Sequence, residues 1–92
     1  KATEERQRAA AELAAASDCM IVVGGKNSGN TRRLAEICAA ACASTHHIES
    51  EDELDPAWFA GAYEVGITAG ASTPQEHIDR VRARIEQIMS GE

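Results

Sequence analysis

A strand, a turn and a helix are predicted in succession within residues 19–43, CMIVVGGKNSGNTRRLAEICAAACA. The run Cys19–Val23 is short, apolar and β-branched toward its end, which is typical of a strand buried on both faces of a parallel sheet. Gly24 and Gly25 end this strand. Residues 31–43 favour a helix, because their apolar side chains recur on one side while arginines occupy the other.

Similar patterns precede and follow this unit. Residues 2–16 are mostly strong helix formers. Short apolar runs at residues 45–48 and 65–68 predict two further strands, and Pro74 is expected at the first position of a helix that continues to about residue 89. Because strands that alternate with helices pair in parallel through right-handed crossovers, we predict an α/β protein, a three-layer α/β/α sandwich with a small parallel sheet.

The acidic segment between the second and third strands is predicted to be irregular. Residues 49–55 form a loop in this interpretation, which Pro56 closes, and a short helix follows through Trp58. The side chain of Trp58 is expected to pack as a lid on the core.

Length and composition limit the class of protein. Residues 1–92 are expected to form a single α/β domain, and the aromatic content of 3% means that each buried position contributes little apolar area. The formal net charge of -6 leaves no basic surface for nucleic acid, and no segment is apolar over the length that a membrane span requires. We therefore expect a soluble protein with neither nucleic acid nor a membrane as its partner.

The cysteines predict a reducing environment. Cys19, Cys38 and Cys42 are odd in number and have no CxxC spacing, so a disulfide framework or a zinc ribbon is not expected. Cys38 and Cys42 lie one helical turn apart on an apolar side, which favours core packing over metal binding. We predict no metal ligand in this chain and a cytoplasmic location.

Two loops carry the candidate chemistry. In residues 24–30 the glycines allow a ligand to approach the backbone, and Ser28 and Asn30 add hydrogen-bond donors at a helix N-terminus. In the loop after the third strand, small residues recur and Ser72 or Thr73 is expected to be the N-cap of the last helix. Because both loops leave the same carboxyl edge of the sheet, they are placed to grip one diphosphate from two sides.

The same loops have a second interpretation. Glycine, serine and asparagine between a strand and a helix are also ordinary turn and capping residues, so the residue types alone leave ligand binding open. The first loop lacks the spacing of a Walker motif, because Lys26 is followed by Asn27, and nucleotide hydrolysis is not indicated. Lys26 either assists the phosphates electrostatically or pins the loop to a neighbouring carbonyl.

The histidines are given structural or surface positions. His46 and His47 have no carboxylate or cysteine partner at the spacing of a metal site. His77 alternates with charged residues in the first turns of the last helix, which predicts a solvated face.

Three separated motifs carry a resemblance to a known family. The chain resembles the third domain of the 4-hydroxy-3-methylbut-2-enyl diphosphate reductase family in the strings VVGGKNSGNTRRLAEIC (residues 22–38), HIES (residues 47–50) and VGITAGASTP (residues 65–74). The opening Ala2-Thr3, followed by RQ, is also similar to the family's pattern. The resemblance covers nearly the whole chain, and the motifs stand in the family's order.

The resemblance implies an iron–sulfur oxidoreductase in which three similar α/β domains surround a four-iron, four-sulfur (4Fe–4S) cluster. The complete enzyme would reductively dehydroxylate 4-hydroxy-3-methylbut-2-enyl diphosphate to isopentenyl and dimethylallyl diphosphates, in the non-mevalonate route to isoprenoids. The implied partners are the remaining domains of the same enzyme and an electron donor of the ferredoxin or flavodoxin type.

The resemblance also implies which residues hold the substrate. Ser28, Asn30 and Ser72 match the family positions that bind the diphosphate, whereas the catalytic residues lie in the other domains. Gly29 stands where the family has a second serine, so only its backbone amide is expected to contribute. The family's cluster cysteine would fall immediately before Lys1, so this chain alone is expected to hold no cluster and to be inactive.

Two other functions stay open at this point. The chain would also suit a free-standing phosphate- or nucleotide-binding α/β module without redox activity. It would equally suit an interaction domain whose loops bind nothing. Titration with phosphate separates these two alternatives.

Overall fold

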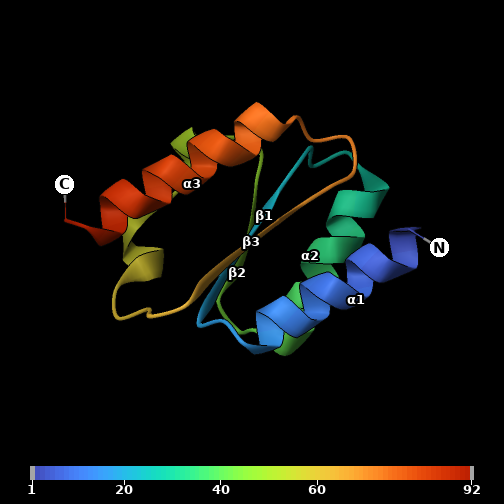
Figure 1. Cartoon of the computed structure of the whole chain (residues 1–92), viewed down its shortest axis with the longest axis horizontal. Coiled ribbons are helices and arrows are strands. Elements are labelled where there is room, and N and C mark those ends of the chain that lie inside the picture. Colours follow the sequence, from blue (N-terminus) through green and yellow to red (C-terminus); the bar gives the residue numbers. More distant parts are fainter. Residues whose placement is uncertain (1, 92) are drawn as a thin grey trace.

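A three-stranded parallel sheet forms the centre of the computed structural model, which describes residues 2–91 (Figure 1). The strands are β1 (Cys19–Val23), β2 (Thr45–Ile48) and β3 (Val65–Ala69), in the spatial order β2-β1-β3. β1 pairs in parallel with both neighbours, so it is the central strand. The three predicted strands and their parallel pairing are confirmed.

Helices cover both faces of this sheet. The helices α1 (Ala2–Ala15) and α2 (Gly29–Ala41) lie together on one face. The opposite face carries α3 (Gln75–Met89) and the two short 3₁₀ helices η1 (Glu51–Glu53) and η2 (Pro56–Phe59). Figure 1 shows the three layers, with the sheet between α3 and the α1–α2 pair. The predicted α/β class and three-layer α/β/α architecture are confirmed.

The core has two unequal halves on either side of β1. All five residues of β1 are buried, because helices pack on both of its faces. The α1–α2 side is made mostly of small side chains and sulfur-containing ones: Ala10, Ala14, Met20, Val22, Leu34, Cys38 and Cys42. The α3 side holds the larger side chains: Cys19, Ile21, Val23, Ile48, Leu54, Phe59, Ala69, Val81 and Ile85. The cysteines therefore pack in the core, as the sequence predicted.

Two helices begin at other residues than predicted. α2 begins at Gly29 rather than at Thr31, because Ser28 is its N-cap and accepts a hydrogen bond from the backbone amide of Thr31 at 3.3 Å. α3 begins at Gln75, and Pro74 occupies the N-cap position without a side-chain hydrogen bond. The prediction that Ser72 or Thr73 caps this helix is therefore wrong.

The acidic segment is more ordered than the predicted loop. A single turn of 3₁₀ helix, η1, forms within it, and η2 follows as the short helix expected after Pro56. Trp58 packs against the core, as predicted, and its ring stacks on His46 with the ring centroids 3.8 Å apart. The stack joins η2 to β2.

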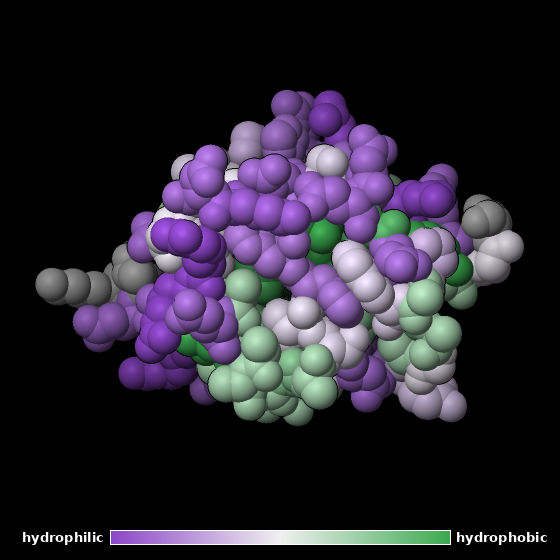
Figure 2. All heavy atoms as spheres, turned by 180° about the vertical axis from the view of Figure 1, so that it is seen from behind, coloured by the Kyte–Doolittle hydropathy of each residue, from purple (hydrophilic) through white to green (hydrophobic). Residues whose placement is uncertain are grey.

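One face of the molecule is mostly polar. The face in Figure 2 is predominantly hydrophilic, and the apolar residues form smaller areas toward its lower edge. Every helix within residues 2–91 is too short or too polar to cross a lipid bilayer.

Candidate functional site

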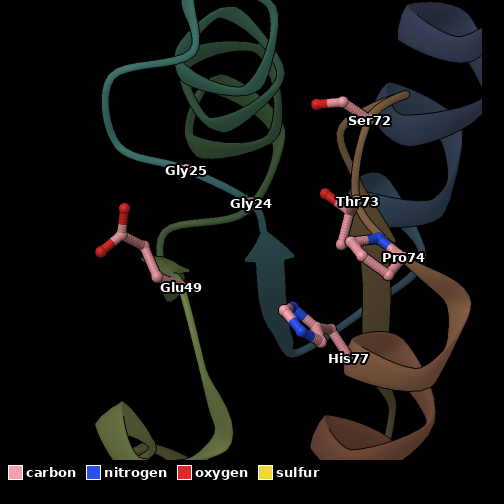
Figure 3. A pocket seen from close by; sticks show the side chains of 7 residues that line it. All are labelled: Gly24, Gly25, Glu49, Ser72, Thr73, Pro74 and His77. Atoms are coloured by element: carbon pink, nitrogen blue, oxygen red, sulfur yellow. The ribbon is translucent and has the colours of Figure 1, made fainter.

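A pocket of about 240 Å³ lies at the carboxyl edge of the sheet (Figure 3). Four segments contribute to it: the β1–α2 loop, the residue after β2, the β3–α3 loop and the first turn of α3. The lining residues are Gly24, Gly25, Glu49, Ser72, Thr73, Pro74 and His77. The structure thus brings the loops after β1 and β3 to one edge, as the parallel topology predicted.

The two loops are joined to each other at the end of β1. The carbonyl oxygen of Val23 accepts hydrogen bonds from the amide of Gly70 and from the hydroxyl of Thr73, each at 3.1 Å. The second of these bonds explains why Thr73 does not cap α3, because the Thr73 hydroxyl donates to Val23 of β1 instead. The second loop is therefore held directly against the first.

Thr31 lies beneath both loops. Its side chain is 1% exposed and contacts the α-carbon regions of Gly24 and Gly70. A β-carbon on Gly24 would lie 2.7 Å from the Thr31 hydroxyl oxygen, and one on Gly70 would overlap the same atom. Gly24 also has a φ of 154°, which side chains rarely permit. Both glycines allow the loops to close over this threonine.

Ser28 is both a helix cap and a candidate donor. Its hydroxyl oxygen accepts hydrogen bonds from the amide of Thr31 at 3.3 Å and from the hydroxyl of Thr31 at 3.1 Å. The buried Thr31 hydroxyl has the Ser28 oxygen as its one hydrogen-bond partner within residues 2–91, so its proton goes to Ser28. The hydroxyl proton of Ser28 then stays available to a ligand.

Gly29 and Asn30 occupy the first two positions of α2. Within residues 2–91, no backbone acceptor is bonded to the amide of either residue, as expected for the first turn of a helix. Gly29 does not have a positive φ, and a β-carbon there would meet nothing within 4 Å. Gly29 and Asn30 are both exposed, so the start of α2 is open to solvent, and a helix end of this kind favours an anion.

The predicted binding residues are only partly gathered by this pocket. Ser72 lines it, whereas Ser28, Gly29 and Asn30 lie farther along the first loop, at the start of α2. All four residues stand at the carboxyl side of the sheet, on loops that the Val23 carbonyl holds together.

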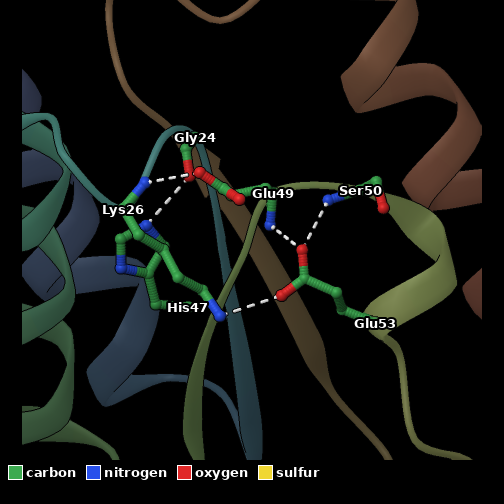
Figure 4. A network of polar contacts seen from close by, with 6 residues as sticks. All are labelled: Gly24, Lys26, His47, Glu49, Ser50 and Glu53. Carbon is green, nitrogen blue, oxygen red and sulfur yellow. Dashed lines mark hydrogen bonds and ion pairs between the residues drawn. The ribbon is translucent and has the colours of Figure 1, made fainter.

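A polar cluster holds the first loop from the side of β2 (Figure 4). The Lys26 ammonium pairs with the Glu53 carboxylate at 2.9 Å, and the Lys26 amide donates to the Glu49 carboxylate at 2.9 Å. Glu53 in turn accepts from the amides of Glu49 and Ser50. We call Lys26, Glu49 and Glu53 the loop clasp. Of the two roles considered for Lys26, the structure shows the loop pinned, though by carboxylates rather than by a carbonyl.

Lys26 and Glu53 of the loop clasp stabilise each other's charge. The hydrogen bond from Lys26 lowers the pKa of Glu53 below its usual value, and the same bond raises the pKa of Lys26. Lys26 is exposed, so solvent weakens this attraction. The cluster serves mainly to fix the direction in which the loop leaves β1.

Two pocket residues were missed by the sequence reasoning. Glu49 and His77 lie on opposite sides of the pocket in Figure 3. His77 was predicted to lie on a solvated face, but its side chain is only partly exposed and lines the pocket. Its position three residues after Pro74, in the first turn of a helix that starts at the sheet edge, was the signal that could have identified it.

His46 and His47 have structural positions, as predicted. His46 stacks on Trp58, and burial lowers its pKa. The Nε2 atom of His47 lies 3.0 Å from the carbonyl oxygen of Gly24, which ties β2 to the start of the first loop.

The cysteines do not fit the ligation of an iron–sulfur cluster. Cys19, Cys38 and Cys42 are buried in the core, and burial raises the pKa of the Cys19 and Cys38 thiols. Across the part of the chain that the structure describes, no three His, Cys, Asp or Glu side chains gather as a metal site would require. The cluster cysteine expected before Lys1 lies outside the described residues.

Comparisons with known proteins agree on one family. A model of the family described as LytB protein matches residues 1–86. The 4-hydroxy-3-methylbut-2-enyl diphosphate reductase of Pelobacter propionicus is 61% identical over 87 residues, which cover 95% of this chain and 31% of that protein. The corresponding protein of Geobacter metallireducens is 56% identical over 89 residues, or 97% of this chain and 32% of that protein.

A solved structure gives the same result for the fold. It is described as (E)-4-hydroxy-3-methyl-but-2-enyl diphosphate reductase, the terminal enzyme of the non-mevalonate pathway. The match has a TM-score of 0.91 and 51% identity, and it covers 94% of this chain and 31% of that one. The chain thus spans about a third of the length of the relatives it matches.

Proposed function

Because the chain belongs to the LytB protein family, we propose that it is the diphosphate-holding part of a 4-hydroxy-3-methylbut-2-enyl diphosphate reductase. In the complete enzyme, the allylic hydroxyl of the substrate would leave as water, giving isopentenyl and dimethylallyl diphosphates. The contribution of this chain is to bind the diphosphate and orient the rest of the molecule.

The meeting of two helix N-termini at one sheet edge is the observation that carries this role. α2 and α3 both begin there, directly after the loops that follow β1 and β3. A helix N-terminus has unpaired amides and a positive partial charge, so it stabilises an anion. Two such ends, on loops joined through Val23, suit a ligand with two linked phosphate groups.

Hydroxyl and amide donors complete the site in this proposal. The Ser28 hydroxyl, the Gly29 and Asn30 amides and the Asn30 side chain would approach the diphosphate from the first loop. Ser72 would approach it from the second loop. Donors from two sides fix the orientation of the diphosphate, and a fixed orientation places the remote hydroxyl for reaction.

The redox chemistry is assigned to other parts of the enzyme. A 4Fe–4S cluster would supply the electrons when bound, with ligands from outside residues 2–91, because the buried cysteines described above do not fit it. A donor of the ferredoxin or flavodoxin type would reduce the enzyme. The free thiols suit a reducing compartment, so we propose a cytoplasmic location.

Titration of the isotope-labelled chain with inorganic diphosphate, followed by NMR, tests the proposed role. We expect the largest shifts at the amides of Gly29, Asn30 and Ser72. Sodium chloride at matched ionic strength is the control, because a general salt effect would move exposed amides over the whole surface. Shifts confined to other regions, or none at all, would show that these loops do not hold the diphosphate.

A further inference from the structure

We propose that Thr31 is a positioning residue of the diphosphate site, which acts by turning the Ser28 hydroxyl into an outward donor. This inference rests on the proposed function, because it concerns the same site. Thr31 itself is buried and would not touch the ligand.

The environment of Thr31 indicates a role beyond packing. It is the one buried polar side chain within the described residues. Burying a hydroxyl is unfavourable unless it is hydrogen-bonded, and the bond that the Thr31 hydroxyl donates goes to the Ser28 oxygen at 3.1 Å. The Thr31 hydroxyl thus lies buried beneath the loops and is directed toward Ser28, a residue of the proposed site.

The direction of the bonds determines what Ser28 does. A serine hydroxyl donates one proton and accepts through its oxygen. Here the oxygen accepts both from the amide and from the hydroxyl of Thr31. If Ser28 donated its proton to Thr31, that proton could not bind a ligand. In this arrangement the Ser28 proton is free to do so. Accepting a bond also strengthens the bond that the same hydroxyl donates.

The position of Thr31 also relates the two loops. Its hydroxyl oxygen packs against both Gly24 and Gly70, which begin the first and second loops. The orientation of Ser28 is therefore set by a residue wedged at the junction of the loops. A change in their separation would be transmitted to the Ser28 hydroxyl through Thr31.

A double-mutant cycle separates this role from simple packing. The affinity for inorganic diphosphate is measured by NMR titration for the parent chain, Thr31→Val, Ser28→Ala and the double variant. We expect Thr31→Val to weaken binding about 3- to 10-fold, which is the usual size of one hydrogen bond. In the Ser28→Ala background the same change should have no further effect, because it acts through the Ser28 hydroxyl.

Two further variants guard against misfolding and test the hydroxyl itself. Thr31→Ser keeps the hydroxyl and loses the methyl group, and it should bind within about 2-fold of the parent chain. Thr31→Ala removes the hydroxyl without adding bulk near the glycines, so it replaces Thr31→Val in the cycle if the valine variant does not fold.

The outcomes are distinct. Equal weakening by Thr31→Val in both backgrounds, or a larger loss for Thr31→Ser than for Thr31→Val, would show that Thr31 only packs, and would overturn the inference. No binding by the parent chain would instead overturn the proposed function, and this inference would fall with it.

Discussion

The two loops at the carboxyl edge follow one plan, but they are stabilised differently. The first, residues 24–28, is held by side chains: the loop clasp from the β2 side and the Ser28–Thr31 bonds at the helix start. The second, residues 70–74, is held by the Val23 carbonyl and by its own turn, in which the Thr73 amide donates to Gly70. Side chains therefore fix the first loop, whereas the exposed Ser72 takes no part in the bonds that hold the second loop.

The largest expected effect comes from the point where the two loops are pressed together. Gly24→Ala should lower the free energy of unfolding by about 2–4 kcal/mol, because the methyl group would meet Thr31 and the backbone φ of 154° is unfavourable for alanine. Urea denaturation of the chain measures this. A change below about 0.5 kcal/mol would show that the loops are not closely packed at this point.

Gly29→Ala, at the first position of α2, is the matched control. A β-carbon at Gly29 meets nothing within 4 Å, and its φ is not positive. Stability should therefore stay within about 0.5 kcal/mol of the parent chain.

Removing one donor from each loop compares their contributions to binding. In the complete enzyme, Ser72→Ala and Asn30→Ala should each lower substrate affinity or kcat/KM roughly 10- to 100-fold, because each deletes a donor that we propose for a charged phosphate oxygen. Steady-state kinetics measures both. Ser90→Ala, at the far end of α3, is a control that should change neither value. Unchanged kinetics for both variants would mean that the substrate-binding residues are wrongly assigned.

A smaller effect is expected from adding a donor to the first loop. Gly29→Ser should leave substrate affinity unchanged or raise it up to about 10-fold, since it adds a hydroxyl at the open start of α2, where we propose that a phosphate binds. The measurement is the substrate KM of the complete enzyme, with Gly29→Ala as the reference without a hydroxyl. Weaker binding by the serine variant alone would indicate that the ligand already fills this space.

The smallest effect concerns the loop clasp, which should open in acid while the second loop stays closed. The pKa of Glu53 is lowered from its usual 4.5 by Lys26, so the contribution of its carboxylate is present above that value and is lost as the pH falls through the folded-state pKa. NMR shifts of the Glu49 and Ser50 amides, which donate to the Glu53 carboxylate, should change in this range, and those of residues 70–73 should not. Glu53→Gln should abolish the transition, and its persistence in that variant would assign it to another carboxylate.

The fold was largely predictable because its signals are local. The apolar run of β1 and the glycines after it specify a buried strand and a turn without reference to the rest of the chain. The first residues of the helices were predicted less accurately. Gly29 and Asn30 look like loop residues, yet the first helical positions tolerate them because their amides need no intrahelical partner. Threonine is a common N-cap residue, but the hydroxyl of Thr73 donates a hydrogen bond to the carbonyl of Val23, which is distant in the sequence.

The residues of the candidate site were predictable only where they directly follow a predicted strand in the sequence. Ser72 follows a strand directly, and the structure places it in the pocket. Glu49 and His77 reach the pocket through the closure of the sheet and the docking of α3, which no local pattern records. The loop clasp depends in the same way on η1, a turn hidden in an acidic stretch that resembles a solvated loop.

The central place of β1 has a consequence for how the protein is made. β1 pairs with β2, which follows after one helix, and with β3, whose Val65 aligns with Cys19 far back in the chain. During synthesis α1, β1, α2 and β2 leave the ribosome first, and they can bury the α1–α2 side of the core before β3 exists. The other side of the core must wait for α3. The edge that bears both loops is therefore completed only after the loop between β3 and α3 has been synthesised.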